Sequence, residues 1–384
     1  MKSTQLFKDF FNSGKAGGLI LLVCTALSLL IANSVFGENY VSFWKTQIGA
    51  YKLSNWINDG LMTFFFLLIG LELEREIYKG ELSNIKDALL PLFGALGGLL
   101  VPAGLYLAFN FGTPTQSGIG IPMATDIAFA LGILSLLGKR VPISLKIFLT
   151  ALAVIDDLCA ILVIAIFYTK TITWSNLFIA FSVFALLLLF NRLKIRNVIP
   201  YLIGGIFMWY FMHNSGVHAT ITGVLLAFAV PFGNGNKQST SYQLQHFLHK
   251  PVAFLILPIF ALANTAFDVG SNFTEIVSEN YSIGIACGLI IGKPVGIFLF
   301  TFFAVSVGLC QLANNLNWKL IIGAGLLGGI GFTMSIFITL LAFNDDQIIN
   351  NAKFIILISS LIAGALGFLL LKLSLKEELN EEDI

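Results

Sequence analysis

Long apolar segments run through this chain from end to end, and they constrain its fold more than any other feature. A helix needs roughly 20 mostly apolar residues to cross the bilayer's hydrocarbon core of about 30 Å. Only 11% of the 384 residues are charged, whereas soluble domains carry about 25%. The sequence therefore predicts an all-α membrane protein with twelve transmembrane helices, near residues 17–35, 57–73, 88–109, 118–137, 147–168, 177–190, 198–213, 215–232, 252–270, 282–306, 320–343 and 353–373.

The remaining composition narrows the possible functions. A net charge of +1 excludes a strongly basic nucleic-acid-binding surface, and none of the four cysteines belongs to a CxxC pair. No motif in the chain calls for a cofactor. We predict a single transmembrane domain over residues 1–384, whose last residues, 375–384, form an acidic cytoplasmic tail that lacks regular structure from Glu377 onward.

The distribution of lysine and arginine predicts the orientation of the chain. If the N-terminus is cytoplasmic, 17 of the 22 basic residues fall in cytoplasmic segments and four in outer segments, while Lys293 remains inside a span. An excess of basic residues is typical of cytoplasmic loops. Both termini are therefore predicted to be cytoplasmic, which requires an even number of spans.

Helix-breaking residues interrupt the predicted fourth and eleventh spans. The fourth contains Gly118-Ile119-Gly120-Ile121-Pro122, and the eleventh contains Gly328-Gly329-Ile330-Gly331-Phe332-Thr333. In a bilayer, an interrupted backbone is tolerated only where protein or a water-filled cavity satisfies its polar groups. Glycines could merely allow close helix packing, but two interrupted spans in separate halves of the chain indicate a transport site near the membrane midplane.

Ionisable residues are rare inside the apolar segments, and the deeply placed ones are Asp126, Asp156, Asp157 and Lys293. Placing such a residue at the centre of a span costs about 2.5–3.5 kcal/mol. The group therefore indicates an ion pathway or a proton relay. The alternative is structural, because a lysine–aspartate pair could simply hold two helices together.

Asp156 and Asp157 are adjacent in the otherwise apolar stretch from Leu152 to Ala160. Two carboxylates this close repel each other, so one or both should bind a proton near neutral pH. Their oxygens are also suitable ligands for a small, hard cation. One site could then hold either Na+ or protons, and competition between them is the simplest exchange mechanism.

Asp126 and Lys293 are placed to balance charge at the interrupted spans. Asp126 follows the break at Pro122, where it would neutralise the positive end of a half-helix, and the Thr125 hydroxyl could cap that helix or bind a cation. Lys293 precedes Pro294, which should bias it away from ideal helix geometry. The lysine could counter the negative ends of half-helices or pair with one aspartate of the couple.

The chain resembles the NhaA-type sodium/proton antiporters in four motifs: Ala124-Thr125-Asp126, Val154-Ile155-Asp156-Asp157, Gly292-Lys293-Pro294-Val295-Gly296 and Gly331-Phe332-Thr333-Met334-Ser335. The resemblance extends from about Asn58 to the last span. It implies an inverted-topology repeat of spans 3–5 and 10–12, with discontinuous helices 4 and 11 crossing at their breaks, around Pro122, Gly329, Gly331 and Thr333.

The resemblance also implies the roles of the buried charges. Asp157 would be the main Na+ ligand, and Asp156 would be its partner, paired with Lys293 in one state. Asp126 and Lys293 would balance the helix dipoles at the crossing.

The function implied by the resemblance is that of a secondary transporter and not of an enzyme. Such a protein extrudes Na+, and also Li+, in exchange for external protons, is electrogenic and pH-regulated, and serves intracellular pH and sodium homeostasis. The expected setting is the bacterial inner membrane, where the chain would form a homodimer.

A second group of ionisable residues is expected at the cytoplasmic face. Glu72, Arg75 and Glu76 end the second span, and His246 and His249 precede the ninth. In the resembled family this face sets the pH response, and histidine titrates near physiological pH. A solvated polar helix end is the alternative.

Three nearby features qualify this interpretation. Gln245 stands where the family commonly has an acid and Glu74 where it commonly has a base, so the pH profile is expected to be shifted. His218 matches a further family motif, although an isolated histidine is more often packed than functional.

The segment from Phe36 to Trp56 alternates aromatic and polar residues around Gly49-Ala50. It is a candidate periplasmic hairpin, an element that joins two protomers in the resembled family. The typical Asn-Gly and Asp-Gly turn sequences do not occur in it.

Other functions fit these residues less well. An intramembrane aspartic protease needs carboxylates on two facing helices, typically with a GxGD motif, whereas these acids are adjacent and no GxGD occurs. A Na+-coupled symporter for organic anions would be expected to carry cationic residues beyond Lys293. A structural or receptor-like membrane protein would gain no stability from four buried charges.

Overall fold

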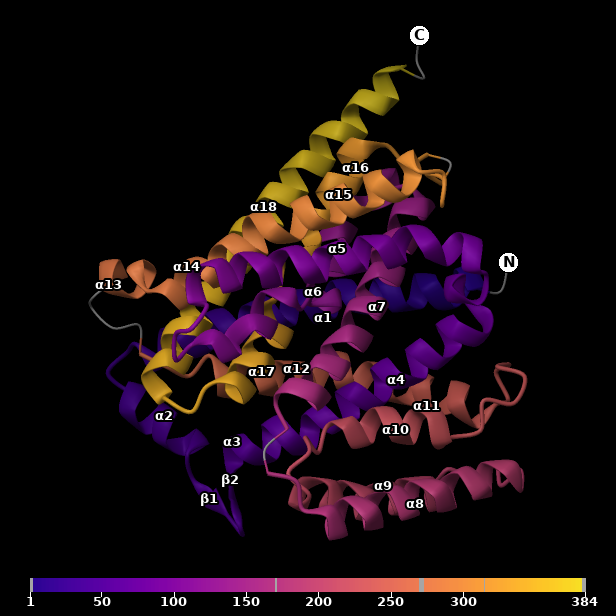
Figure 1. Ribbon diagram of the computed structural model, residues 1–384, viewed down its shortest axis with the longest axis vertical. Coiled ribbons are helices and arrows are strands. Elements are labelled where there is room, and N and C mark those ends of the chain that lie inside the picture. The colour runs from indigo at the N-terminus through magenta and orange to yellow at the C-terminus, as the bar shows by residue number, and fades with distance from the viewer. Residues whose placement is uncertain (1–2, 170, 269–272, 314, 382–384) are drawn as a thin grey trace. The chain divides into compact units, whose positions relative to one another are not determined.

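The computed structural model describes residues 3–169, 171–268, 273–313 and 315–381, and most of this backbone is helical (Figure 1). The chain forms two compact units, each assembled from separate stretches of sequence. Unit 1 comprises Met1–Leu22, Asn84–Ala160 and Phe267–Ile384, and unit 2 comprises Val23–Ser83 and Ile161–Ala266.

Unit 1 contains the helices that carry the four motifs. After the first part of α1 (Ser3–Ala32) come α5 (Ile85–Asn110), a 3-10 helix (Gln116–Met123), α6 (Ile127–Leu136), a short 3-10 turn (Gly138–Arg140) and most of α7 (Ile143–Phe167). The second half of the unit consists of α13 (Phe273–Ser278), α14 (Asn280–Cys287), a π-helical turn (Gly288–Gly292), α15 (Lys293–Ser306), α16 (Trp318–Gly328), α17 (Phe332–Ala342) and α18 (Asp346–Glu381).

Unit 2 contains the remaining helices and the described strands. Its first segment holds α2 (Gly37–Trp44), β1 (Gln47–Ile48), β2 (Tyr51–Lys52), α3 (Leu53–Asn55), a π-helical turn (Trp56–Leu61), α4 (Met62–Lys79) and a 3-10 helix (Glu81–Ser83). Its second segment holds α8 (Trp174–Arg192), α9 (Ile199–Asn214), α10 (Ile221–Ala229), α11 (Thr240–Pro251), a π-helical turn (Val252–Ile256) and α12 (Leu257–Asn264).

The structure confirms an all-α membrane protein, with fewer full-length spans than the sequence predicts. Among the described residues, eight helices are long and apolar enough to cross a membrane, or up to ten if each of two bent helix pairs is one span. The predicted seventh and eighth spans correspond to α9 and α10, which have only 16 and nine residues. At 1.5 Å per residue they rise about 24 and 14 Å, short of the hydrocarbon thickness. Positions 269–270 of the predicted ninth span lie outside the described residues.

Both predicted interruptions are present. Pro122 lies near the end of the 3-10 helix, Ala124 is extended with ψ 146°, and α6 begins only after Asp126. In the eleventh span, α16 ends at Gly328, α17 begins at Phe332, and the two bend by 46°. The glycine and proline signals therefore located both breaks.

The π-helical turns were not predicted, and one of them bears on the expectation for Lys293. The lysine has φ −62° and ψ −58°, but its N–H donates to the carbonyl oxygen of Gly288, five residues earlier. The expected departure from ideal helix geometry before Pro294 is therefore present as the closing hydrogen bond of the π-helical turn Gly288–Gly292. Turns of this kind frequently occur at functional sites.

α5 and α15 lie side by side in unit 1 and approach closely at a pair of glycines (Figure 1). A methyl group on Gly97 would lie 2.1 Å from the backbone oxygen of Gly296, and one on Gly296 would lie 2.1 Å from that of Gly97. Small residues permit such close backbone contact between membrane helices. Because Lys293 is about one helical turn before Gly296, this contact positions the lysine within unit 1.

The predicted hairpin is confirmed as a structure. β1 and β2 pair antiparallel, with Ile48 opposite Tyr51, and Gly49 in the turn has φ +64°. Glycine adopts this left-handed conformation without the steric cost that other residues carry.

The expected absence of regular structure in the acidic tail is wrong for residues 377–381. α18 continues without interruption to Glu381, so the transmembrane helix extends into the tail. Residues 382–384 lie outside the described part of the chain.

The glycine contact generates a stability prediction. Gly97→Ala should lower the unfolding temperature of the detergent-solubilised protein, because overpacking typically costs about 1–3 kcal/mol. Gly104→Ala is the matched control on the same helix, since a methyl group there meets no atom within 4 Å. Alanine has a higher helix propensity than glycine, so both variants gain the same contribution from the helix itself. Equal unfolding temperatures for the two variants would contradict the close approach of α5 and α15.

Candidate functional site

The two interrupted spans meet within unit 1 and satisfy each other's backbone. The N–H of Asp126, at the first break, donates to the carbonyl oxygen of Ile330, at the second, over 2.7 Å. The Ser335 hydroxyl of α17 donates to the carbonyl oxygen of Ile121 over 2.6 Å. Each break therefore provides polar partners for the other, which an interrupted backbone requires inside a membrane.

Asp126 caps two half-helices at once. Its Oδ1 accepts the N–H of Phe129 in α6 over 3.0 Å, and its Oδ2 accepts the N–H and the hydroxyl of Thr333 in α17 over 3.1 and 2.5 Å. The carboxyl group is buried. It thus faces the positive ends of both helices, where the sequence had indicated only the first.

Ser360 of α18 completes the cap of α17. Its Oγ accepts the N–H groups of Gly331 and Phe332 over 3.2 and 3.1 Å. These are two of the N–H groups that lack partners at any helix start. Sequence reasoning missed Ser360, because a serine inside an apolar span does not indicate which helix it will cap.

Lys293 is fully buried and contacts both an acid and a helix end. Its Nζ donates to Asp156 Oδ2 over 2.5 Å and also to the carbonyl oxygen of Met123, the last residue of the 3-10 helix. The sequence left two alternatives for this lysine, pairing with an aspartate or countering a negative helix end. The structure shows both interactions together.

Thr125 connects the ion pair to the second break. Its Oγ1 lies 2.6 Å from Asp156 Oδ2 and 2.8 Å from the carbonyl oxygen of Gly328, the last residue of α16. A hydroxyl has one hydrogen and can donate to only one of these oxygens at a time. A proton on Asp156 would reverse the first bond and leave the hydroxyl to donate to Gly328.

Asp156 and Asp157 are buried neighbours on α7. While Oδ2 of Asp156 contacts Lys293 and Thr125, its Oδ1 is buried without a hydrogen-bond partner among the described residues. An unsatisfied buried acceptor costs about 1–3 kcal/mol. This oxygen is therefore open to a proton or a cation.

The predicted pH-response residues lie in unit 2, and all of them except His218 are on α4 or α11. His249 Nε2 is 3.4 Å from Glu72 Oε1, with both side chains partly buried. The Arg75 guanidinium lies 4.6 Å from the ring centre of Tyr242, whose ring stacks on His246 at 6.2 Å. The end of α4 therefore packs against α11 through two separate sets of contacts and is not simply a solvated helix end.

Two of the predicted residues have other surroundings. Glu76 accepts the N–H of Glu81 over 3.0 Å and so caps the 3-10 helix that follows α4. His218 lies in the turn before α10, where its carbonyl oxygen accepts the N–H of Ile221. Glu74, which the sequence marked only as unusual, is buried and accepts the Ser241 hydroxyl over 3.0 Å.

The buried ion pair generates a prediction that does not depend on transport. Lys293→Met should lower the unfolding temperature strongly, because removing one partner of a buried pair costs about 3–5 kcal/mol. Adding Asp156→Asn should restore most of the loss, which a double-mutant cycle measures. Lys372→Met, at an exposed lysine of α18, is the control. Purely additive losses in the double variant would show that the two groups are not coupled.

Comparison with known proteins identifies the family. The model of the family described as Na+/H+ antiporter 1 matches residues 8–371. The Na(+)/H(+) antiporter NhaA of Flavobacterium psychrophilum is 70% identical over 99% of both chains. That of Cytophaga hutchinsonii is 58% identical over 100% of this chain and 99% of its own, and that of Dechloromonas aromatica is 56% identical over 96% of both. The resemblance seen in the four motifs is thus confirmed, and the chain belongs to the Na+/H+ antiporter 1 family of secondary transporters.

Proposed function

We propose that this chain exchanges Na+ for H+, with Asp156 and Asp157 as the shared site. The observation that carries the proposal is the buried carboxylate of Asp156, which meets Lys293 and Thr125 through one oxygen and leaves the other oxygen without a partner. Such a carboxylate can be neutralised by the lysine ammonium, by a proton or by Na+. Each of these cations excludes the others, so one site serves both transported ions.

Lys293 forms an ion pair with Asp156 in the conformation described, with Nζ 2.5 Å from Oδ2. A positive charge this close repels an entering cation. Na+ therefore binds only when the ammonium moves away from Asp156 or gives up its proton. Cation entry and proton release are linked at this carboxylate.

The remaining Na+ ligands in this proposal are oxygens of neighbouring residues. Asp157, adjacent on α7, supplies the second carboxylate and is the main ligand. Thr125 contributes its hydroxyl oxygen once its hydrogen points to the Gly328 carbonyl, which lies 2.8 Å away. Carboxylate, hydroxyl and carbonyl oxygens are the ligands that hard cations prefer.

The crossing of the broken helices belongs to the same proposal. We infer an inverted repeat of spans 3–5 and 10–12 within a twelve-span topology, and the glycine contact between α5 and α15 supports it. The Asp126–Ile330 backbone bond between the two breaks supports it as well. Asp126 and Lys293 balance the helix ends there, so the aspartate pair is left for the transported ions.

The setting of the protein is inferred from its basic residues and its relatives. The excess of basic residues in alternate segments supports cytoplasmic termini in a bacterial inner membrane. Na+ and Li+ would then leave the cell as external protons enter. The β1–β2 hairpin would join two protomers, and the contacting residues Glu72, Arg75, His246 and His249 would adjust activity to pH.

The aspartate pair is tested by Na+-driven pH change inside proteoliposomes. Asp157→Asn and Asp156→Asn should each reduce exchange to the level of empty liposomes, since an amide neither ionises nor balances the charge of Na+. Asp268→Asn, at an exposed aspartate of unit 1, is the matched control and should exchange at the native rate. Native exchange by a correctly folded Asp157→Asn variant would refute the proposed site.

Net charge movement is a separate prediction. Two neighbouring carboxylates can release two protons as one Na+ binds, which leaves one charge uncompensated in each cycle. A membrane potential then contributes about 2.3 kcal/mol per charge per 100 mV. Clamping the potential with valinomycin and K+ gradients should therefore change the exchange rate. A rate that does not depend on the potential would indicate one proton for each Na+.

A further inference from the structure

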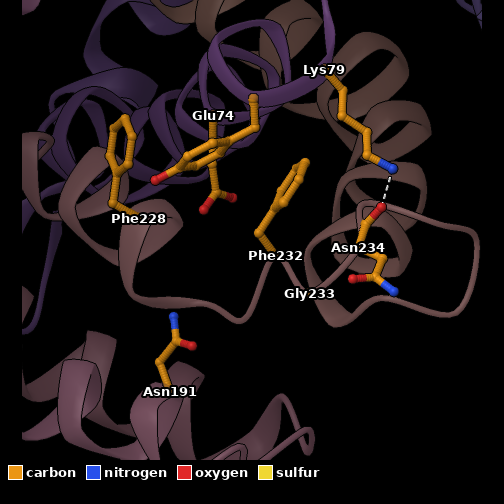
Figure 2. A pocket seen from close by; sticks show the side chains of 8 residues that line it. Glu74, Lys79, Asn191, Phe228, Phe232, Gly233 and Asn234 are labelled. Atoms are coloured by element: carbon orange, nitrogen blue, oxygen red, sulfur yellow. Dashed lines mark hydrogen bonds between the residues drawn. The ribbon is translucent and has the colours of Figure 1, made fainter. Parts of the chain in front are cut away.

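A cavity of about 560 Å³ lies in unit 2, between the end of α4, the end of α8 and the loop after α10 (Figure 2). Its walls combine one carboxylate with several aromatic rings: Glu74, Tyr78, Phe228 and Phe232. The Asn191 side chain lines another part of the wall. None of these residues takes part in the proposed exchange of Na+ and protons.

Glu74 is the acidic residue of the cavity wall. The residue is only 3% exposed, and Figure 2 shows its carboxylate between the rings of Phe228 and Phe232. The Ser241 hydroxyl donates to Oε2 over 3.0 Å, and no basic group of the described residues pairs with it within 4.0 Å. Burial disfavours the ionised form of this acid, and a cation bound beside it would favour that form, so the cavity suits a cationic occupant.

Lys79 of the cavity wall and Arg75, the next residue after Glu74 in the chain, both make other contacts. Lys79 also lines the cavity, but its Nζ donates to the carbonyl oxygen of Asn234, to one side of Phe232 in Figure 2. The guanidinium of Arg75 lies over the ring of Tyr242. Arg75 attracts Glu74 electrostatically, but neither basic group forms an ion pair with it within 4.0 Å.

The aromatic walls indicate which kind of cation fits. The rings of Tyr78 and Phe232 lie 5.1 Å apart with a tilt of 39°, and Phe228 adds a third ring. Aromatic faces attract cations, and alkylated ammonium ions are the ligands that such walls characteristically bind. A hydrated metal ion would instead need several oxygen ligands in a fixed geometry, which phenyl rings do not offer.

We propose that this cavity binds a small organic ammonium ion, with its charge against Glu74 and its alkyl groups against the rings of Tyr78, Phe228 and Phe232. The carboxylate repels anions. A neutral apolar molecule would fill the space but leave Glu74 unpaired. The site is distinct from the Asp156–Asp157 pair in both its residues and its ligand.

Equilibrium dialysis of radiolabelled choline against the purified full-length protein, in buffer without Na+, tests this site. Binding should be saturable. Glu74→Gln removes the charge but keeps an acceptor for Ser241, and Phe232→Leu removes one ring but keeps its apolar volume. Each should weaken binding at least about tenfold, or roughly 1.4 kcal/mol. The uncharged isostere 3,3-dimethyl-1-butanol should displace choline at least about tenfold less well than unlabelled choline.

Matched variants separate this site from the rest of the chain. Phe247→Leu, at a 70% exposed ring on α11, and Glu38→Gln, at an exposed acid of α2, should bind choline normally. Asp157→Asn should also bind normally, because the ion site is not involved. Should the glutamine variant not fold, Phe232→Leu and the uncharged isostere still decide the question. Any of three results would overturn the proposal: no saturable binding of choline, unchanged binding in both test variants, or equal displacement of choline by the alcohol.

Discussion

The buried contact between Lys293 and Asp156 is the interaction on which the rest of unit 1 depends. A charge inside a bilayer must be paired, and this pair forms only if α15, α7 and the end of the 3-10 helix meet at one place. The close approach at Gly97 and Gly296 brings α15 to that place. The two broken spans then surround the pair. The same arrangement therefore packs the helices, supplies hydrogen-bond partners for the interrupted backbone and balances the buried charges.

Much of this arrangement was predictable because it rests on local patterns. Apolar length predicted the membrane helices, and each predicted span contains helical residues. Proline and glycine located both breaks, and the scarcity of buried charges singled out Asp126, Asp156, Asp157 and Lys293. The sequence predicted only part of the role of Asp126. Its place after a break predicts that it caps α6, but not that it also caps α17.

What was not predictable depends on groups without a sequence signal. The backbone carbonyl oxygens of Met123 and Gly328 accept hydrogen bonds in the site, and a residue of any type would supply the same atom. The cap supplied by Ser360 depends on how α18 packs, and the π-helical turn before Lys293 has no recognised sequence pattern. Apolar composition likewise marked α9 and α10 as spans, although their helices end too soon to cross a bilayer unaided.

The central claim is that Na+ and protons compete for one carboxylate site, and Na+ binding measured against pH tests it most directly. Isothermal titration of the purified protein with Na+ at a series of pH values reports the apparent Kd. Below the pKa of the competing carboxyl group, competition predicts a Kd that rises about tenfold for each unit of falling pH for every proton displaced, and the slope counts those protons. A Kd for Na+ that stays constant over the whole series of pH values would contradict a shared site.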